Sequence, residues 1–269
     1  MRSILLLIVS VSVGCSVPDT SGVLLIGHGG QGADGPDPMN SREALLGGLA
    51  DGFDGIEMDV QMTADGVLVA YHEQYLQGAC VGLVNARSWE ELRACDARMV
   101  RVDSLLTDAL RIFPTAEFTL DVKLFAAGEW TAYLETFSTA ITDLDERSHG
   151  GRPLLVECQV EEFLVRLGQR SGAVHRFLYA TEAATAISQA RAIGCTGITV
   201  HLDGITEDEA VEARAAGLEL TLFGIGGRRT LRKALRLQPD RIQSDVAFTR
   251  RIKENIRGQA PTVNDPSAH

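Results

Sequence analysis

Charged side chains interrupt two strand-like stretches of this 269-residue sequence, where apolar residues would be usual. The stretch IEMDV carries Glu57 and Asp59 two positions apart, and the stretch FTLDVK carries Asp121 and Lys123 with the same spacing. Side chains two positions apart on a strand point to the same face. If the two strands are neighbours, three carboxylates and one ammonium group converge, and burying them without a function would be costly.

The three carboxylates form a ligand set typical of a hard divalent cation. Carboxylates that lie this close repel one another unless a cation neutralises them, and oxygen ligands are those that Mg²⁺ and Ca²⁺ require. We therefore predict that Glu57, Asp59 and Asp121 bind Mg²⁺ or Ca²⁺. Zinc ligation by His28 and His72 is a weaker alternative, because no cysteine or paired-histidine spacing supports it.

Two histidines complete a catalytic set. His28 ends the apolar run of residues 23–28, and His72 ends the run of residues 67–72. Imidazole can accept and donate protons near neutral pH, so we interpret the pair as general acid and base, with His28 as base and His72 as acid. Any one of these polar residues alone would more often be structural; six at neighbouring strand ends favour a site.

Apolar runs alternate with amphipathic segments along the chain. The runs predicted to be strands are residues 23–28, 56–60, 118–124, 154–158, 177–180, 197–201, 218–223 and 241–244. The segments predicted to be helices are residues 41–51, 104–113, 130–144, 161–169, 182–193, 207–216, 230–237 and 248–256. This pattern predicts one α/β domain, a (β/α)8 TIM barrel, in which active sites lie at the carboxyl ends of the strands.

The run of residues 67–72 follows the second strand too closely for a helix to intervene. Its connection ends in Asp65-Gly66, a turn signal, so we predict a β-hairpin inserted after strand 2. Two helix starts carry capping-box signatures, Asn40 with Glu43 and Thr206 with Glu209.

The N-terminal residues resemble an export signal. One positive charge precedes the apolar residues 4–13, a run too short to span a bilayer. Gly14-Cys15 resembles the lipobox of bacterial lipoproteins, so we predict a signal peptide over residues 1–14 and a linker over residues 15–22 with a lipidated Cys15. An ordinary signal peptide cleaved nearby is the alternative. We expect the barrel over residues 23–257 and a disordered polar tail over residues 258–269.

This signal predicts a bacterial cell-envelope lipoprotein, periplasmic or outer-membrane-anchored, or otherwise a secreted protein. The four remaining cysteines agree with an oxidising compartment. Cys80 and Cys95 bracket a glycine-containing loop, which predicts a local disulfide, whereas Cys158 and Cys195 beside apolar runs are expected to be buried thiols.

The formal net charge of −11 is unfavourable for nucleic-acid binding. A small-molecule or lipid phosphodiester must then be held by a few local cations or a metal. We expect membrane contact only through the lipid anchor, and the sequence implies no protein partner.

These residues resemble motifs of the glycerophosphodiester phosphodiesterase family. That family has a strand ending His-Arg-Gly, a Pro-Glu-Asn-Thr-like helix start, a Glu-x-Asp-Val strand, a Thr-x-Asp-Gly turn and a Val-x-x-His-Asp hairpin end. The corresponding stretches here are IGHGG, PMNS, IEMDV, TADG and VAYHE. Further on, FTLDVK, LTLFGIGG and PDRIQSD resemble the family's later strands, so the likeness covers most of residues 23–248.

The resemblance implies metal-dependent hydrolysis of a glycerophosphodiester to an alcohol and glycerol phosphate. The resemblance gives the two histidines and the three carboxylates the same roles that strand geometry gives them, acid–base catalysis and metal binding. It also makes Lys123 a phosphate contact. Four positions depart from the family's motifs, with Gly29 for arginine, Met39 for glutamate, Asp121 for glutamate and Phe223 for tryptophan.

The loss of the arginine leaves the phosphate in need of another cation. Arg228, or its neighbour Arg229, follows strand 218–223 and is the predicted replacement, although a solvated position on the helix is the open alternative. Phe223 and His201 are further predicted substrate contacts.

Two other functions remain open. An aspartate two residues before a lysine, without the arginine, resembles the sphingomyelinase D/phospholipase D branch of the same superfamily, which implies a lyase acting on lysophospholipids. A catalytically inactive barrel acting as a binding lipoprotein is the third hypothesis.

Overall fold

The structure is a computed structural model and describes residues 22–148 and 153–246. The predicted signal peptide, Cys15, the helix at residues 248–256 and the C-terminal tail lie outside the described residues.

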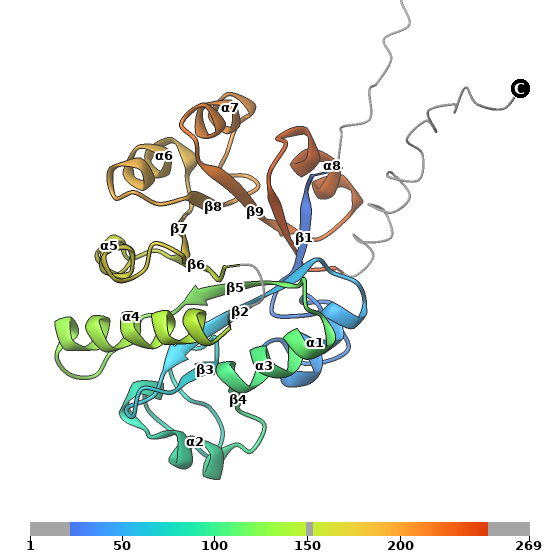
Figure 1. Cartoon of the computed structure of the whole chain (residues 1–269). Coiled ribbons are helices and arrows are strands. Elements are labelled where there is room, and N and C mark those ends of the chain that lie inside the picture. Colours follow the sequence, from blue (N-terminus) through green and yellow to red (C-terminus); the bar gives the residue numbers. More distant parts are fainter. Residues whose placement is uncertain (1–21, 149–152, 247–269) are drawn as a thin grey trace, which may run out of the picture.

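Eight parallel strands form a closed barrel, as the sequence predicts (Figure 1). They are β1 (Leu24–Gly27), β2 (Gly55–Met62), β5 (Glu117–Val122), β6 (Leu155–Cys158), β7 (His175–Ala180), β8 (Gly197–His201), β9 (Glu219–Ile225) and β10 (Arg241–Ser244). Strand β1 pairs with both β10 and β2, which leaves the barrel without a free edge. The result is a (β/α)8 TIM barrel.

Helices surround the barrel and lie between successive strands (Figure 1). They are α1 (Arg42–Ala50), α3 (Val102–Ile112), α4 (Trp130–Arg147), α5 (Glu161–Arg170), α6 (Ala183–Ala192), α7 (Glu207–Ala215) and α8 (Arg228–Arg236). Each was predicted to within a few residues. The predicted capping box of Thr206 and Glu209 is present at the start of α7. Among the described residues, no helix is long and apolar enough to cross a membrane.

The predicted capping box of Asn40 and Glu43 is wrong. Ser41 is the N-cap of α1, and its hydroxyl accepts a hydrogen bond from the Ala44 backbone N–H. Asn40 has a φ of +64°, and its side chain is turned away from the helix toward β2. A hydrogen bond to a buried carboxylate is stronger than an exposed cap, so tertiary contacts outweigh the local preference of this asparagine.

The hairpin predicted after β2 is present and continues into a small subdomain. Strand β3 (Leu68–Ala70) is antiparallel to β2, and β4 (Val100–Arg101) is antiparallel to β3. Between them lie η1 (Val84–Ala86) and α2 (Trp89–Cys95), two elements that the sequence pattern did not predict. The subdomain has an apolar cluster of its own, made of Val69, Leu76, Cys80, Val84 and Leu92.

The cysteine predictions are confirmed. Cys80 and Cys95 form a disulfide that closes the loop of this subdomain, whose few apolar residues make a cross-link useful. Cys158 and Cys195 are free and buried.

The amino-terminal end of the barrel contains a compensated charge cluster. The Arg241 guanidinium forms ion pairs with the carboxylates of Glu117 and Glu219. It also lies 5.3 Å from the ring centroid of Phe177. Arg241 and Glu117 are almost completely buried, so the cluster fills this end of the barrel as part of the core.

Candidate active site

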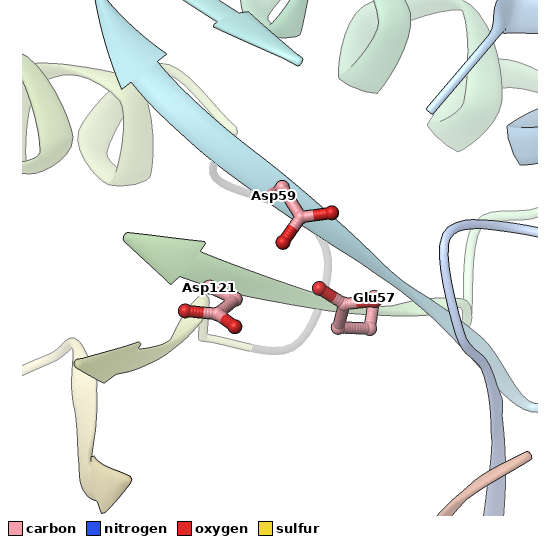
Figure 2. A group of neighbouring side chains, drawn as sticks. All are labelled: Glu57, Asp59 and Asp121. Atoms are coloured by element: carbon pink, nitrogen blue, oxygen red, sulfur yellow. The ribbon is translucent and has the colours of Figure 1, made fainter. Parts of the chain in front are cut away.

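The three predicted metal ligands lie together at the carboxyl end of neighbouring strands (Figure 2). Asp59 on β2 is the register partner of Asp121 on β5, and Glu57 is two residues before Asp59 on the same face. One oxygen from each carboxylate lies within 4.8 Å of the others, and all three residues are buried. The strand pairing therefore produces the convergence that the spacing predicted.

Glu57 is the most poorly compensated carboxylate of the three. Its Oε2 accepts a hydrogen bond of 2.8 Å from the Gly29 backbone N–H, whereas its Oε1 is buried without a hydrogen-bond partner. Burial and the neighbouring charge of Asp59 raise its pKa well above the ordinary value. A buried oxygen that lacks a partner and lies among other carboxylates fits a cation ligand, and the all-oxygen set fits a hard cation.

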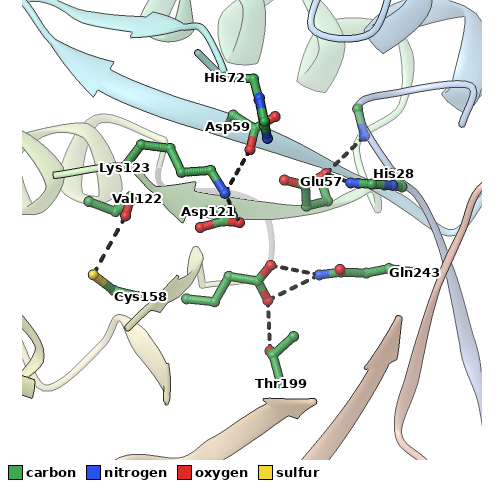
Figure 3. Close-up of polar contacts among 12 residues, drawn as sticks. His28, Glu57, Asp59, His72, Asp121, Val122, Lys123, Cys158, Thr199 and Gln243 are labelled. Carbon is green, nitrogen blue, oxygen red and sulfur yellow. Dashed lines mark hydrogen bonds and ion pairs between the residues drawn. The ribbon is translucent and has the colours of Figure 1, made fainter. Parts of the chain in front are cut away.

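Lys123 contacts the other two carboxylates (Figure 3). Its Nζ lies 2.6 Å from Asp121 Oδ2 and 3.1 Å from Asp59 Oδ1. Burial alone would lower the pKa of Lys123, but the charges of Asp121 and Asp59 outweigh it and hold that pKa above its ordinary value. Lys123 is therefore charged, and a single ammonium compensates only part of the carboxylate charge.

Asn40 fixes the orientation of Asp59. Its Nδ2 donates a 2.7 Å hydrogen bond to Asp59 Oδ2, and its Oδ1 accepts a 3.0 Å hydrogen bond from the Asp59 backbone N–H. This bidentate contact holds the carboxylate still, as groups that support metal ligands commonly do.

His28 lies at the rim beside Glu57. Its Nδ1 is 2.6 Å from Asp245 Oδ1, and its Nε2 is 3.9 Å from Glu57 Oε2. Burial would lower the pKa of His28, but the hydrogen bond with Asp245 and the charges of Glu57, Asp245 and Asp59 raise it to about 9. Asp245 thus orients the imidazole, with Nε2 facing the carboxylates.

His72 reaches the same rim from the hairpin rather than from a barrel strand. The Tyr71 backbone N–H donates to the Asp59 carbonyl at 2.9 Å, which brings the next residue beside the carboxylates (Figure 3). Gln61 Nε2 donates to the carbonyls of Tyr71 and Glu73 at 3.0 and 2.8 Å, and so holds the backbone on both sides of His72. The imidazole is 58% exposed, with its Nδ1 3.2 Å from Glu73 Oε1.

A fourth carboxylate, Glu157, lies in the barrel interior next to the predicted ligands. Glu157 on β6 is the register partner of Asp121. It accepts hydrogen bonds from Gln243 Nε2 at 2.9 and 3.0 Å and from the Thr199 hydroxyl at 2.7 Å. Burial and the charge of Asp121 raise the pKa of Glu157 to about 7. The barrel therefore holds more negative charge at this end than the three predicted ligands supply.

Gly29 and Met39, two of the departures from the family's motifs, are in contact. Gly29 has a φ of +55°, and a Cβ at this position would overlap the side chain of Met39. A side chain at position 29 is therefore excluded while Met39 keeps its place. The arginine and glutamate of the family's motifs are replaced here by backbone and a thioether.

Aromatic side chains line the opposite side of the mouth. Tyr179 on β7 and Phe223 on β9 stack with centroids 5.0 Å apart, and His201 on β8 meets Phe223 edge-on at 5.1 Å. A Cβ on Gly224 would overlap the His201 ring, so this glycine lets the imidazole lie against β9. The Tyr179 ring centroid is 6.0 Å from Lys123 Nζ, which joins the aromatic side to the carboxylate cluster.

Arg228 is not joined to this group by any contact within the described residues. It is the first residue of α8 and is exposed, as is Arg229. The structure thus brings together His28, His72, Glu57, Asp59, Asp121 and Lys123, places Phe223 and His201 at the far side of the mouth, and leaves Arg228 at the rim.

Sequence reasoning did not identify Asn40, Glu157, Tyr179, Gln243 or Asp245. Asp245 had a signal, since it ends the RIQSD stretch directly after a predicted strand. Glu157 also interrupts an apolar strand, LLVEC, on the pattern that revealed Glu57. Asn40 also had a signal, since it occupies the asparagine position of the PMNS stretch that resembles the family's helix start, but its contact with Asp59 depends on how a loop folds back over β2.

A family model described as the glycerophosphoryl diester phosphodiesterase family matches residues 28–247. A glycerophosphodiester phosphodiesterase of Bacillus altitudinis is 41% identical over 69 residues, which are 25% of this chain and 28% of that protein. An uncharacterized protein of Bacillus subtilis is 36% identical over a stretch of the same coverage. Each match therefore spans little more than a quarter of the relative's length.

Solved structures share the fold over nearly the whole described chain. A phosphodiesterase of Oleispira antarctica, solved with the product sn-glycerol-3-phosphate, has a TM-score of 0.72 at 17% identity, covering 86% of this chain and 96% of that chain. A glycerophosphodiester phosphodiesterase of Parabacteroides distasonis has a TM-score of 0.74 at 16% identity, covering 88% and 99%.

Proposed function

The chain belongs to the glycerophosphoryl diester phosphodiesterase family, and we propose that it hydrolyses a glycerophosphodiester-type substrate to an alcohol and glycerol phosphate. The observation that carries this proposal is the convergence of Glu57, Asp59 and Asp121 with two histidines at the carboxyl end of the barrel. A structural role does not account for so many poorly compensated carboxylates beside one open rim.

A divalent cation, Mg²⁺ or Ca²⁺, is the second part of the proposal. Glu57, Asp59 and Asp121 would hold it, with Asn40 keeping Asp59 in place. When bound, the cation supplies positive charge to the phosphoryl oxygens. The chain's own residues bind and orient the phosphate: Lys123 offers an ammonium group between Asp59 and Asp121, close to the same position.

The proposed proton transfers use His28 and His72. His28 with its pKa of about 9 holds its proton at neutral pH as long as the carboxylates beside it are uncompensated. Added positive charge among Glu57 and Asp59 would lower that pKa, so that Nε2 could accept a proton from the water that attacks phosphorus, as a general base does. His72, exposed and on the hairpin side of Asp59, would then donate a proton to the leaving alcohol.

Leaving-group chemistry tests the assignment of the two histidines. A 4-nitrophenolate leaves without a proton, so loss of the general acid should hardly change the rate for a 4-nitrophenyl diester. The rate for an alkyl diester should fall by about 10²–10⁴-fold. We expect His72→Ala to show this difference and His28→Ala to impair both substrates. His175→Ala, in the first residue of β7 at the other end of the barrel, is the matched control. A difference shown by His28→Ala instead would reverse the roles.

Chelation tests the cation. Activity should vanish in excess chelator and return with Mg²⁺ or Ca²⁺, whereas full activity in chelator would refute the metal ligands. Direct titration of the metal-free protein with Mg²⁺ and Ca²⁺ by calorimetry gives the affinity independently of turnover, and Glu57→Gln should weaken it.

Arg228 stays a proposed phosphate contact. Its position at the start of α8, just beyond the end of β9, supports the proposal, and its exposure supports the alternative of a solvated residue. A charged hydrogen bond to phosphate contributes about 1.5–3 kcal/mol, so Arg228→Ala should raise KM by roughly tenfold or more. An unchanged KM in both Arg228→Ala and Arg229→Ala would leave Lys123 as the phosphate contact.

Lyase action on a lysophospholipid is the second candidate. The contact of Gly29 with Met39 favours it, because the β1 loop offers the phosphate backbone atoms and a thioether in place of a guanidinium. Phosphorus NMR of the product separates the reactions: a cyclic phosphate from an intact lysophospholipid indicates the lyase, and glycerol phosphate from a deacylated diester indicates the hydrolase. No turnover of either class with metal present would indicate a binding protein.

We also propose that the protein is exported and that Cys15 is lipidated. The Cys80–Cys95 disulfide supports an oxidising compartment, because such bonds are rare in the reducing cytosol. Mass spectrometry of the mature N-terminus tests the lipid, and an unmodified terminus beyond Cys15 would refute it.

A further inference from the structure

Helix α8 has a charge opposite to that of the protein as a whole. The chain has 25 Lys and Arg residues against 36 Asp and Glu residues, and its net charge is −11. Over nine residues α8 contains five of those cations and no acid. They are Arg228, Arg229, Arg232, Lys233 and Arg236, and all five are exposed.

The five cations of α8 share one face. Successive residues of an α-helix are rotated by about 100°, so these positions fall within an arc of roughly 140°. Leu231, Ala234 and Leu235 occupy the opposite side and are buried against the barrel. The outer face of α8 is therefore continuous, basic and free of large apolar side chains.

Within the described residues, four of the five cations on α8 have no ion pair. Elsewhere among the described residues, some exposed arginines pair with nearby acids, as Arg93 does with Glu90 and Arg98 with Asp96. On α8, within the described residues, only Lys233 has an ion pair, 2.6 Å from Asp203 Oδ1, and both side chains are largely exposed. Exposed pairs of this kind contribute little, so the basic face is available to a partner.

We infer that the basic face of α8, made of Arg228, Arg229, Arg232, Lys233 and Arg236, binds the surface of an anionic phospholipid bilayer. The argument is charge complementarity. Guanidinium groups match phosphate geometry in two parallel hydrogen bonds, and a bilayer surface presents many phosphates to such a face at once. Without exposed apolar residues the helix adsorbs on the surface and does not insert.

The remaining negative charge orients the molecule. The preceding helix α7 begins with Glu207, Asp208 and Glu209, so an anionic surface repels that part of the protein. Salt at physiological strength screens charges beyond about 8 Å, so the adsorbed face of α8 dominates the contact.

The location of α8 connects adsorption to the candidate site. The helix starts at Arg228, shortly after β9 ends at Ile225 at the mouth of the barrel (Figure 1). A protein adsorbed along α8 therefore has the Arg228 end of this helix, next to the mouth, on the lipid surface and the Arg236 end toward the other end of the barrel. This inference does not depend on the reaction at the mouth, and it adds a second membrane contact to the proposed lipid anchor.

Vesicle co-sedimentation tests the inference. The full chain carries Cys15→Ser, so that no acyl chain can be attached, and is mixed with phosphatidylcholine vesicles with or without phosphatidylglycerol. We expect binding to the anionic vesicles to exceed binding to the neutral ones and to weaken as salt is added. Each cation removed should lower anionic binding by about fivefold, so Arg232→Gln/Lys233→Gln/Arg236→Gln should lower it by on the order of 100-fold.

A control with the same change in net charge is Arg93→Gln/Arg98→Gln/Arg111→Gln, which alters exposed residues outside α8. It should leave anionic binding nearly unchanged, and the circular dichroism spectra of both variants should match the parent. If both variants lost anionic-vesicle binding equally, net charge alone would explain the binding, and the inference would be overturned. No preference for anionic vesicles, or tighter binding to a DNA duplex in the same buffer, would also overturn it.

Discussion

Both ends of the barrel bury carboxylates, but only the amino-terminal end compensates them. There, Arg241 pairs with Glu117 and Glu219 and lies against Phe177. The guanidinium offers donors to both carboxylates, and the aromatic ring covers it. In a buried cluster of this kind the charges compensate one another, so no further ion is needed to balance them.

At the carboxyl end the balance is broken. Glu57, Asp59, Asp121 and Glu157 face one lysine and one histidine, and an oxygen of Glu57 has no hydrogen-bond partner. Burial raises the pKa of three of these carboxyl groups above their ordinary values. This difference supports the proposal that the carboxyl end is the functional one, because a bound cation would supply the positive charge that this end lacks.

The largest effect should follow from removing a carboxylate at the carboxyl end. Glu57→Gln keeps the hydrogen bond from the Gly29 backbone N–H but removes a charge. We expect kcat to fall on the order of 10³-fold, because several kcal/mol of transition-state stabilisation depend on the cation. Thermal unfolding in chelator should show a variant at least as stable as the parent, since one repelling charge is gone. Unchanged kcat would remove Glu57 from the site.

The opposite result should follow at the amino-terminal end. Arg241→Met leaves Glu117 buried without its guanidinium and should cost about 3–5 kcal/mol of unfolding free energy. Activity per folded molecule and cation affinity should stay at parental levels. Urea unfolding measures the first and calorimetry the second.

The double variant Arg241→Met/Glu117→Gln is the control for this prediction. It should regain much of the lost stability, because the buried carboxylate is gone and the remaining one, Glu219, has a side chain that is 37% exposed to water. If Arg241→Met abolished catalysis in folded protein, the two ends would not be independent.

Glu157 should show how much free energy of unfolding is lost when a carboxylate at this end is buried without a compensating cation. Its pKa of about 7 in the folded protein lies above the ordinary value of 4.5, so folding favours its protonated form. The contribution to stability is full below pH 4.5 and is lost as the pH rises through about 7. In chelator at pH 8, Glu157→Gln should be more stable than the parent by up to about 3 kcal/mol. A pH dependence of unfolding equal in parent and variant would contradict this.

The smallest effect should come from the rim. Asp245→Asn removes the charge that pairs with His28 Nδ1 at 2.6 Å, and the pKa of His28 in the metal-free protein should fall below its value of about 9. NMR titration of the imidazole measures that shift. Activity should fall roughly 10–100-fold, because a charged carboxylate no longer orients the imidazole. An unchanged His28 titration would show that Glu57 and Asp59 raise this pKa by themselves.

The sequence by itself determined the eight-stranded barrel, because strand and helix periodicities are local and are repeated eight times. It also determined the convergence of Glu57, Asp59, Asp121 and Lys123, since alternation along a strand fixes the face on which each side chain lies. The Cys80–Cys95 disulfide could also be predicted from the sequence, because its two cysteines lie close together in the chain.

Tertiary structure decided what depended on segments that fold back from elsewhere. Asn40 binds Asp59 instead of capping the helix, and Asp245, directly after the last strand, binds His28. The register between β5 and β6 places Glu157 beside Asp121. The side chain of Met39 fills the space that an arginine at position 29, as in the family's motif, would need. These contacts join residues far apart in the chain, and local periodicity cannot predict which distant side chain will contact a buried charge.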